Sequence, residues 1–271
     1  MRSTPRIHPH LTRVYPFLGA AGSLLACLVV LASALAYSGK QAEPYSLLNH
    51  FISELGETGV SRAAWLFNAG LVASGALLIP SAIGLGLHLR TVWSLLGMAA
   101  GVSAGVFLAG VGFFPMNNLA PHAFTAMWFF RTGLATVLLF GIAFATQGRG
   151  RIRVRRVAVL FSAIAAASYA VFLLMASPPS GGTSSFDASL FARRPPLWPL
   201  AVVEWAVFFA TILWFLAVSL MVRRADPEAT RADGSQVRAA SRSRQEASHS
   251  LRTTGAPSAP RRNRGSRAPR G

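Results

Sequence analysis

The chain contains six apolar stretches, each long enough to cross the hydrocarbon core of a membrane as a helix. Such a crossing covers about 30 Å and needs roughly 20 helical residues. Backbone groups cannot stay unpaired in lipid, so α-helices are the expected form of these stretches. Charged residues make up only 13% of the 271 residues, too few for an ordinary soluble domain. The predicted fold is therefore an all-α bundle of six transmembrane helices at residues 17–37, 63–87, 93–114, 124–145, 155–176 and 199–222.

The first apolar stretch allows a second interpretation. Three arginines precede it, and the sequence "ASALA" at residues 32–36 resembles the small-residue cleavage site of a signal peptide. The stretch is long for the apolar part of a signal peptide, and five further spans follow it. We therefore expect an uncleaved first helix.

Basic residues in the short loops predict the orientation of the bundle, because cytoplasmic loops are enriched in Arg and Lys. One set of alternate loops carries nine such residues and the other set carries four. The nine are Arg2, Arg6, Arg13, Arg90, Arg149, Arg151, Arg153, Arg155 and Arg156, and the four are Lys40, Arg62, Arg193 and Arg194. We expect a multi-pass protein of the bacterial plasma membrane with both termini in the cytoplasm and three loops facing outward.

Three segments are predicted: an N-terminal segment at 1–13, the six-helix domain at 14–222 and a basic tail at 223–271. The tail has twelve arginines, four acidic residues and no aromatic residue, so we expect it to be disordered. Its charge could attract anionic lipid headgroups or, without specificity, nucleic acid; alternatively, it is a solvated tail that only helps to set orientation. Because much of the net charge of +17 lies there, no specific nucleic-acid partner is predicted.

The first outer loop contains the polar sequence "NHFISELGETG" at residues 49–59. If a helix starts after Pro44, its apolar positions form one stripe, and its ionisable positions lie on the opposite side. The stripe is Tyr45, Leu48, Ile52 and Leu55; the opposite side is His50, Glu54 and Glu57, with Asn49 and Ser53 on a flank. This pattern predicts an amphipathic helix that lies in the membrane interface or caps the bundle.

Two histidines and a carboxylate make acid–base chemistry conceivable at this face. His50 and Glu54 are four residues apart, so the carboxylate could orient the imidazole. The second outer loop adds His122 beside Asn117 and Asn118. The candidate catalytic residues are His50, Glu54 and His122; zinc binding by the same groups is an alternative. No HExxH, nucleophile-elbow, Walker or dinucleotide motif is present, and Cys27 is the single cysteine, so neither a metal nor a cofactor is predicted.

Polar residues also occur inside three of the predicted spans. Asn68, Arg131 and Glu204 lie at similar predicted depths below the outer surface, and an unpaired charge at that depth is costly. We expect Arg131 to pair with Glu204, either as a brace between helices or as a ligand contact, although Arg131 could instead snorkel to the interface. The predicted ligand-binding residues are Asn49, Ser53, Asn68, Asn118, Arg131 and Glu204.

Three sequences, "YSLLNHFISELGETG", "LFNAGLVASGAL" and "GVGFFPMNNLAPHAFTA", resemble the signature of a prokaryotic membrane family described as domain of unknown function nine-nine-eight. That family is similar to the six-helix Frag/DRAM/Sfk-type proteins. The resemblance covers roughly residues 14–222. Glu54 stands where many members have aspartate, which keeps the carboxylate but lengthens its reach. The matching positions are Ile52, Ser53, Leu55, Gly56, Asn68, Gly70, Phe114, Pro115 and His122.

The resemblance implies six spans, an outward polar site and lipid as the class of ligand. Two functions remain open. One is a protein that binds or organises a lipid or small amphiphile, with membrane lipids as its partners; the other is a lipid hydrolase or transferase that uses His50 or His122 with Glu54. Transport has less support, because no inverted repeat and no deep midplane charge is visible.

Overall fold

The structure is a computed structural model that describes residues 9–148, 154–177 and 194–222. Within these ranges all six long helices are apolar enough to cross a membrane, which confirms the predicted fold class. The predicted tail at 223–271 lies outside the described residues. The elements are α1 (Pro9–Leu35), the 3₁₀ helix η1 (Ile52–Gly56), α2 (Ala64–Leu89), α3 (Val92–Phe113), α4 (Leu119–Ala145), α5 (Ala158–Ala176) and α7 (Pro199–Met221).

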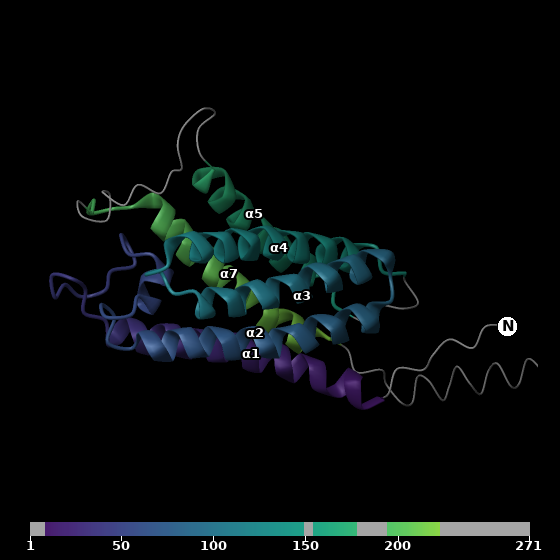
Figure 1. Ribbon diagram of the computed structural model, residues 1–271. Coiled ribbons are helices and arrows are strands. Elements are labelled where there is room, and N and C mark those ends of the chain that lie inside the picture. Colours follow the sequence, from purple (N-terminus) through teal and green to yellow (C-terminus); the bar gives the residue numbers. More distant parts are fainter. Residues whose placement is uncertain (1–8, 149–153, 178–193, 223–271) are drawn as a thin grey trace, which may run out of the picture. The chain divides into compact units, whose positions relative to one another are not determined.

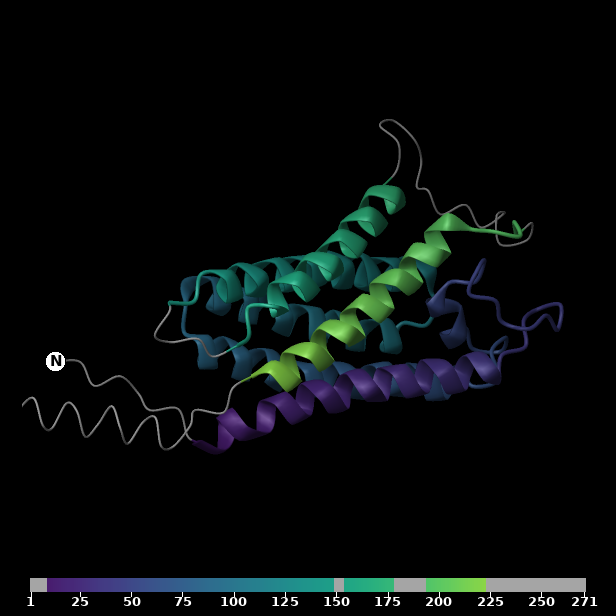
Figure 2. The same cartoon turned by 180° about the vertical axis from the view of Figure 1, so that it is seen from behind.

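The six α-helices form a closed ring. Each packs against the next along the chain, and α7 packs against both α5 and α1. Figure 1 shows α1 to α4 side by side, and the reverse view in Figure 2 shows α7 crossing between α5 and α1. Because the ring closes through α7, residues far apart in sequence meet at its ends.

Small residues allow the helices on one side of the ring to approach closely. A Cβ added to Gly75 in α2 would lie 2.5 Å from the carbonyl oxygen of Gly105 in α3. Gly97 of α3 faces Phe140 of α4 in the same way. Such approaches let backbones make the van der Waals contacts that hold helices together in lipid.

The helices bury large side chains inside the ring and also expose large apolar side chains on its outer faces. Trp214 of α7 is 1% exposed, and its indole N–H donates a 2.8 Å hydrogen bond to Ser162 Oγ of α5. By contrast, Leu28 of α1, Leu174 of α5 and Leu220 of α7 are largely exposed. Large apolar side chains on the outer faces are expected where the surrounding solvent is lipid.

The predicted amphipathic helix after Pro44 is wrong. Residues 45–51 are irregular, with a turn at residues 47–49, and only Ile52–Gly56 is helical, as the 3₁₀ helix η1. The predicted amphipathic helix required His50 and Glu54 to lie on a face exposed to water, but each is only 2% exposed. Buried polar groups need hydrogen-bond partners, and the irregular segment supplies one, because the backbone N–H of Phe51 donates to Glu54 Oε1 at 2.8 Å.

Candidate functional site

One end of the ring is covered by three segments, residues 36–63, 114–118 and 194–198, and we call it the capped end. The backbone N–H of Trp198 donates to the carbonyl of Leu48 at 2.8 Å. The Asn117 side chain accepts from the backbone N–H of Thr58 and donates to its carbonyl, at 2.7 and 2.8 Å. These bonds fasten all three segments into one cap.

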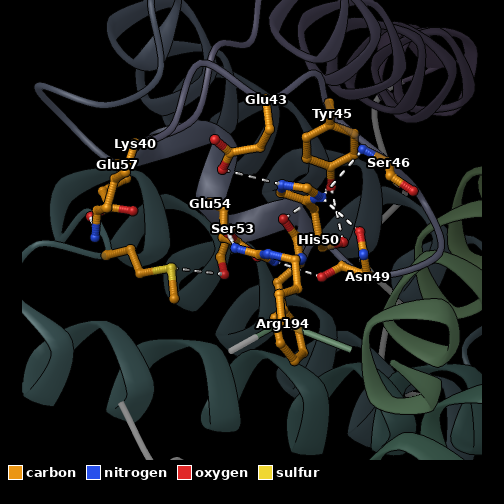
Figure 3. Close-up of polar contacts among 12 residues, drawn as sticks. Lys40, Glu43, Tyr45, Ser46, Asn49, His50, Ser53, Glu54, Glu57 and Arg194 are labelled. Atoms are coloured by element: carbon orange, nitrogen blue, oxygen red, sulfur yellow. Dashed lines mark hydrogen bonds and ion pairs between the residues drawn. The ribbon is translucent and has the colours of Figure 1, made fainter. Parts of the chain in front are cut away.

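An ion pair forms the centre of the cap. Arg194 Nη1 and Nη2 donate to Glu54 Oε1 and Oε2 at 2.9 and 2.6 Å, as Figure 3 shows. The same Nη1 also donates to the carbonyl of Asn49 at 2.6 Å. The two side chains are 17% and 3% exposed, so the pair is largely removed from water. Two parallel bonds of this kind fix geometry as well as charge.

The pKa of Arg194 is raised. Burial alone would lower it, but the hydrogen bonds and the negative charge of Glu54 outweigh that effect. The guanidinium therefore stays charged and committed to Glu54. Because both carboxylate oxygens are occupied, Glu54 holds the cap together rather than presenting a free base.

His50 lies between Glu43 on one side and Ser46 and Asn49 on the other (Figure 3). Its Nδ1 lies 3.0 Å from Asn49 Oδ1, and its Nε2 lies 4.0 Å from Glu43 Oε1, beyond hydrogen-bond distance. Burial lowers the pKa of His50, although Glu54 and Glu43 oppose that shift. The predicted dyad of His50 with Glu54 is not formed, because Glu54 is turned to Arg194.

Of three further predicted ligand residues, two tie the cap together or to α2. Asn49 Nδ2 donates to the carbonyl of Pro195 at 3.0 Å, and Asn68 Nδ2 donates to the carbonyl of Gly56 at 3.0 Å. Asn118 is exposed just before α4 and makes no side-chain cap bond there. These positions therefore stabilise or border the cap rather than facing a cavity.

Beneath the cap, inside the ring, lies a cavity of about 120 Å³. Its walls are mostly apolar and come from α1, α2, α3, α4 and α7, while Ile52 and Ser53 of η1 close its capped end. Ser53 Oγ lies 3.8 Å from Met116 Sδ, so the cap carries a weak polar contact here. The remaining polar lining at this end is Glu204 of α7 and His122 of α4.

Glu204 and His122 each keep one side-chain atom without a partner. The backbone N–H of Ile52 donates to Glu204 Oε2 at 2.7 Å, and among the described residues Oε1 has no hydrogen bond. His122 is 5% exposed, and its Nδ1 lies 2.7 Å from the carbonyl of Phe114. A carbonyl only accepts, so Nδ1 carries the proton and Nε2 of a neutral ring is left as an acceptor.

The predicted pair of Arg131 with Glu204 is not formed, which corrects the sequence interpretation. The Arg131 guanidinium lies over the Trp128 ring, 5.4 Å from its centroid, and Arg131 is exposed. Helix α4 begins at Leu119, earlier than predicted, so Arg131 lies roughly 18 Å along it, whereas Glu204 lies about 7.5 Å into α7. The two charges therefore differ in depth and face different surroundings.

The structure thus brings six of the nine predicted site residues together in two groups. Asn49, His50 and Glu54 meet in the cap, and Ser53, His122 and Glu204 meet at the cavity. The sequence analysis counted Arg194 only among the basic loop residues that predict orientation, and it did not predict the ion pair of Arg194 with Glu54. The burial of Glu54 would have been the signal, since a buried carboxylate requires a cation and the outer loops hold few of them, but the predicted amphipathic helix placed Glu54 on its polar side.

Within the described residues, no three His, Cys, Asp or Glu side chains gather closely enough to hold a metal ion.

Six helices long and apolar enough to cross a membrane, arranged around an apolar cavity, define a multi-pass membrane protein. Residues 20–221 match a family described as "Protein of unknown function (DUF998)", and the chain belongs to that family. Neither the curated proteins nor the solved structures include a match to the chain.

Proposed function

We propose that this protein binds a small amphiphile drawn from the membrane, with the apolar part of the ligand in the cavity and its polar group beside Glu204 and His122. One observation carries the proposal: an apolar cavity of about 120 Å³ ends at two polar side chains that each keep a free acceptor atom. Apolar pockets with a few convergent polar groups are the usual form of small-molecule sites.

The fixed cap supports binding more than catalysis. A catalytic histidine needs a group that orients it and takes up charge. Among the described residues, neither His50 nor His122 makes a hydrogen bond to a carboxylate, and Glu54 is already occupied by Arg194. These contacts fit a site that is already ordered and binds a ligand without a chemical step.

Mass spectrometry of the purified full-length chain, followed by analysis of the extracted small molecules, tests the proposal. Ala104→Phe fills the cavity from α3, and Ala99→Phe adds the same ring to an exposed position of the same helix. We expect an amphiphile to co-purify with the native chain and Ala99→Phe but not with Ala104→Phe. Equal co-purification with both variants would contradict a ligand in this cavity.

We also propose that the capped end faces outward, as the distribution of basic residues predicts. With Cys27 replaced, single cysteines can be placed at Arg62 in the cap and at Gly148 on the opposite side of the bundle. A membrane-impermeant thiol reagent added to intact cells should label Arg62→Cys and spare Gly148→Cys. The reverse pattern would invert the orientation.

A further inference from the structure

Among the described residues, the cavity offers a ligand acceptor atoms and no free cation. We infer that the head group bound there donates hydrogen bonds, as a hydroxyl or an amine does, and that it belongs to a short single-chain or single-ring amphiphile rather than to an anionic lipid. This inference rests on the proposed function and specifies the ligand of the same site.

Both polar atoms that are left without a partner at the capped end of the cavity can accept a hydrogen bond. His122 Nε2 holds a lone pair because Nδ1 donates to the carbonyl of Phe114. Glu204 Oε1 makes no hydrogen bond after Oε2 accepts from Ile52, and it can accept one whether the carboxyl group is charged or neutral. A buried acceptor that stays unpaired is unfavourable, so a donating head group would be stabilised by both atoms.

The hydroxyl groups in the lining already use their protons. Ser23 donates to the carbonyl of Gly19, Thr136 to that of Thr132, and Thr211 to that of Val207, all at 2.7–2.8 Å. Ser53 Oγ is directed at Met116 Sδ. The lining therefore supplies few protons to a phosphate or a carboxylate.

Nearby cations are also committed elsewhere. Arg194 is held by both oxygens of Glu54 and by the carbonyl of Asn49. Arg131 lies over Trp128, is exposed and does not line the cavity. An anionic head group would therefore enter an apolar site beside a carboxyl group with no countercharge, which is strongly unfavourable.

The size of the cavity limits the apolar part of the ligand. An apolar cavity of about 150 Å³ is known to hold benzene. At about 120 Å³, this cavity accommodates a ring or a chain of similar size and not the two acyl chains of a phospholipid.

The inference is tested with three photoreactive probes that share one diazirine-bearing chain of about six carbons and differ only in the head group: alcohol, amine and carboxylic acid. Each is crosslinked to the full-length protein in detergent, and labelled peptides are identified by mass spectrometry. We expect saturable labelling of cavity-lining peptides by the alcohol or the amine and at least about tenfold less labelling by the acid.

This experiment distinguishes a failure of the inference from a failure of the proposed function. If the acid labels the cavity peptides as strongly as the alcohol and the amine do, the inference about the head group is overturned, while the proposal that the cavity binds an amphiphile stands. If no probe labels the cavity peptides, both are overturned. The Ala104→Phe variant should lose the labelling and Ala99→Phe should keep it; unchanged labelling in Ala104→Phe would show that the probes bind elsewhere.

Glu204→Gln tests the head-group chemistry directly. The amide oxygen can still accept from Ile52, while an NH₂ group replaces the free acceptor. Labelling by the amine should fall about tenfold and labelling by the acid should rise. Unchanged preference among the three probes would exclude Glu204 as the group that selects the ligand.

Discussion

Glu54 and Glu204 are two carboxylates near the same end of the bundle, and their partners differ. Glu54 accepts two bonds from Arg194 and one from the backbone of Phe51, so both its oxygens are used. Glu204 accepts a single bond from Ile52 and faces a cavity. A carboxylate with a full set of partners stabilises a fold, whereas one with a free oxygen beside an apolar cavity is available to a ligand.

The two carboxylates are also linked through η1. Glu54 receives the backbone N–H of the residue before η1, and Glu204 receives that of its first residue. The ion pair of the cap therefore holds in place the segment that closes the cavity. Damage to the cap should reduce stability, whereas damage to the cavity end should affect binding.

The largest expected effect follows from removing the cation of the cap. Arg194→Met leaves Glu54 buried without a countercharge, and stranding one member of a buried pair costs about 3–5 kcal/mol of unfolding free energy. The double variant with Glu54→Gln should lose less than the sum of the two single variants, because no stranded charge remains. Thermal unfolding in detergent measures all three.

Lys40→Met is the matched control for that cycle. Lys40 is 68% exposed and pairs with Glu57 at 2.8 Å, and an exposed pair contributes about 0–1 kcal/mol. Strictly additive losses from Arg194→Met and Glu54→Gln would show that their bonds do not act as one unit, and the proposed contrast with Glu204 would fail.

A smaller effect should follow from loosening η1 from α2. Asn68→Ala removes the hydrogen bond to the carbonyl of Gly56, which should cost about 1 kcal/mol. Asn118→Ala is the control, since that asparagine is exposed and makes no cap bond. Equal melting temperatures for the two variants would mean that the Asn68 bond contributes nothing to the stability of the cap.

The positions of the transmembrane helices could largely be predicted from the sequence. The spans follow from local hydropathy and length, so four of the six predicted ranges agree with the observed helices to within three residues at both ends. The exceptions are α1, which begins at Pro9 rather than Phe17, and α4, which begins at Leu119 rather than Phe124 because Pro121 and His122 interrupt the apolar run without breaking the helix. The shift of α4 removed the reason to pair Arg131 with Glu204.

The candidate site was only partly predictable because its bonds join distant parts of the chain. Arg194 meets Glu54 across 140 residues, and Glu204 meets Ile52 across 152. Residue types predicted that Glu204 would need a partner and that Glu54 and His122 would contribute to a site, but only the closed ring determines which partners they find.

The smallest expected effect concerns His50, the one cap side chain with a buried ring nitrogen, Nε2, that has no hydrogen bond. Burial lowers its pKa; Glu54 and Glu43 oppose the shift, while Arg194 adds to it. Between that lowered pKa and the usual value of about 6.5, the unfolded chain binds more protons than the folded one, so stability should fall as the pH drops through this range.

Melting temperatures at about pH 7.5 and about pH 5.5, above and below the usual histidine pKa, measure this dependence. His50→Gln should lose less stability on acidification than the native chain, because it has no imidazole to protonate. An identical loss in the variant would assign the acid sensitivity to other groups.

The most direct test of the account compares Glu54→Gln with Glu204→Gln in one experiment that records both the melting temperature and crosslinking by the photoreactive amine. Glu54→Gln should lower the melting temperature clearly, while the protein that remains folded is still labelled at the cavity. Glu204→Gln should keep a near-native melting temperature and lose about tenfold in labelling. If Glu204→Gln unfolds as readily as Glu54→Gln, Glu204 is a structural carboxylate like Glu54; if it keeps full labelling, Glu204 does not bind the ligand's head group.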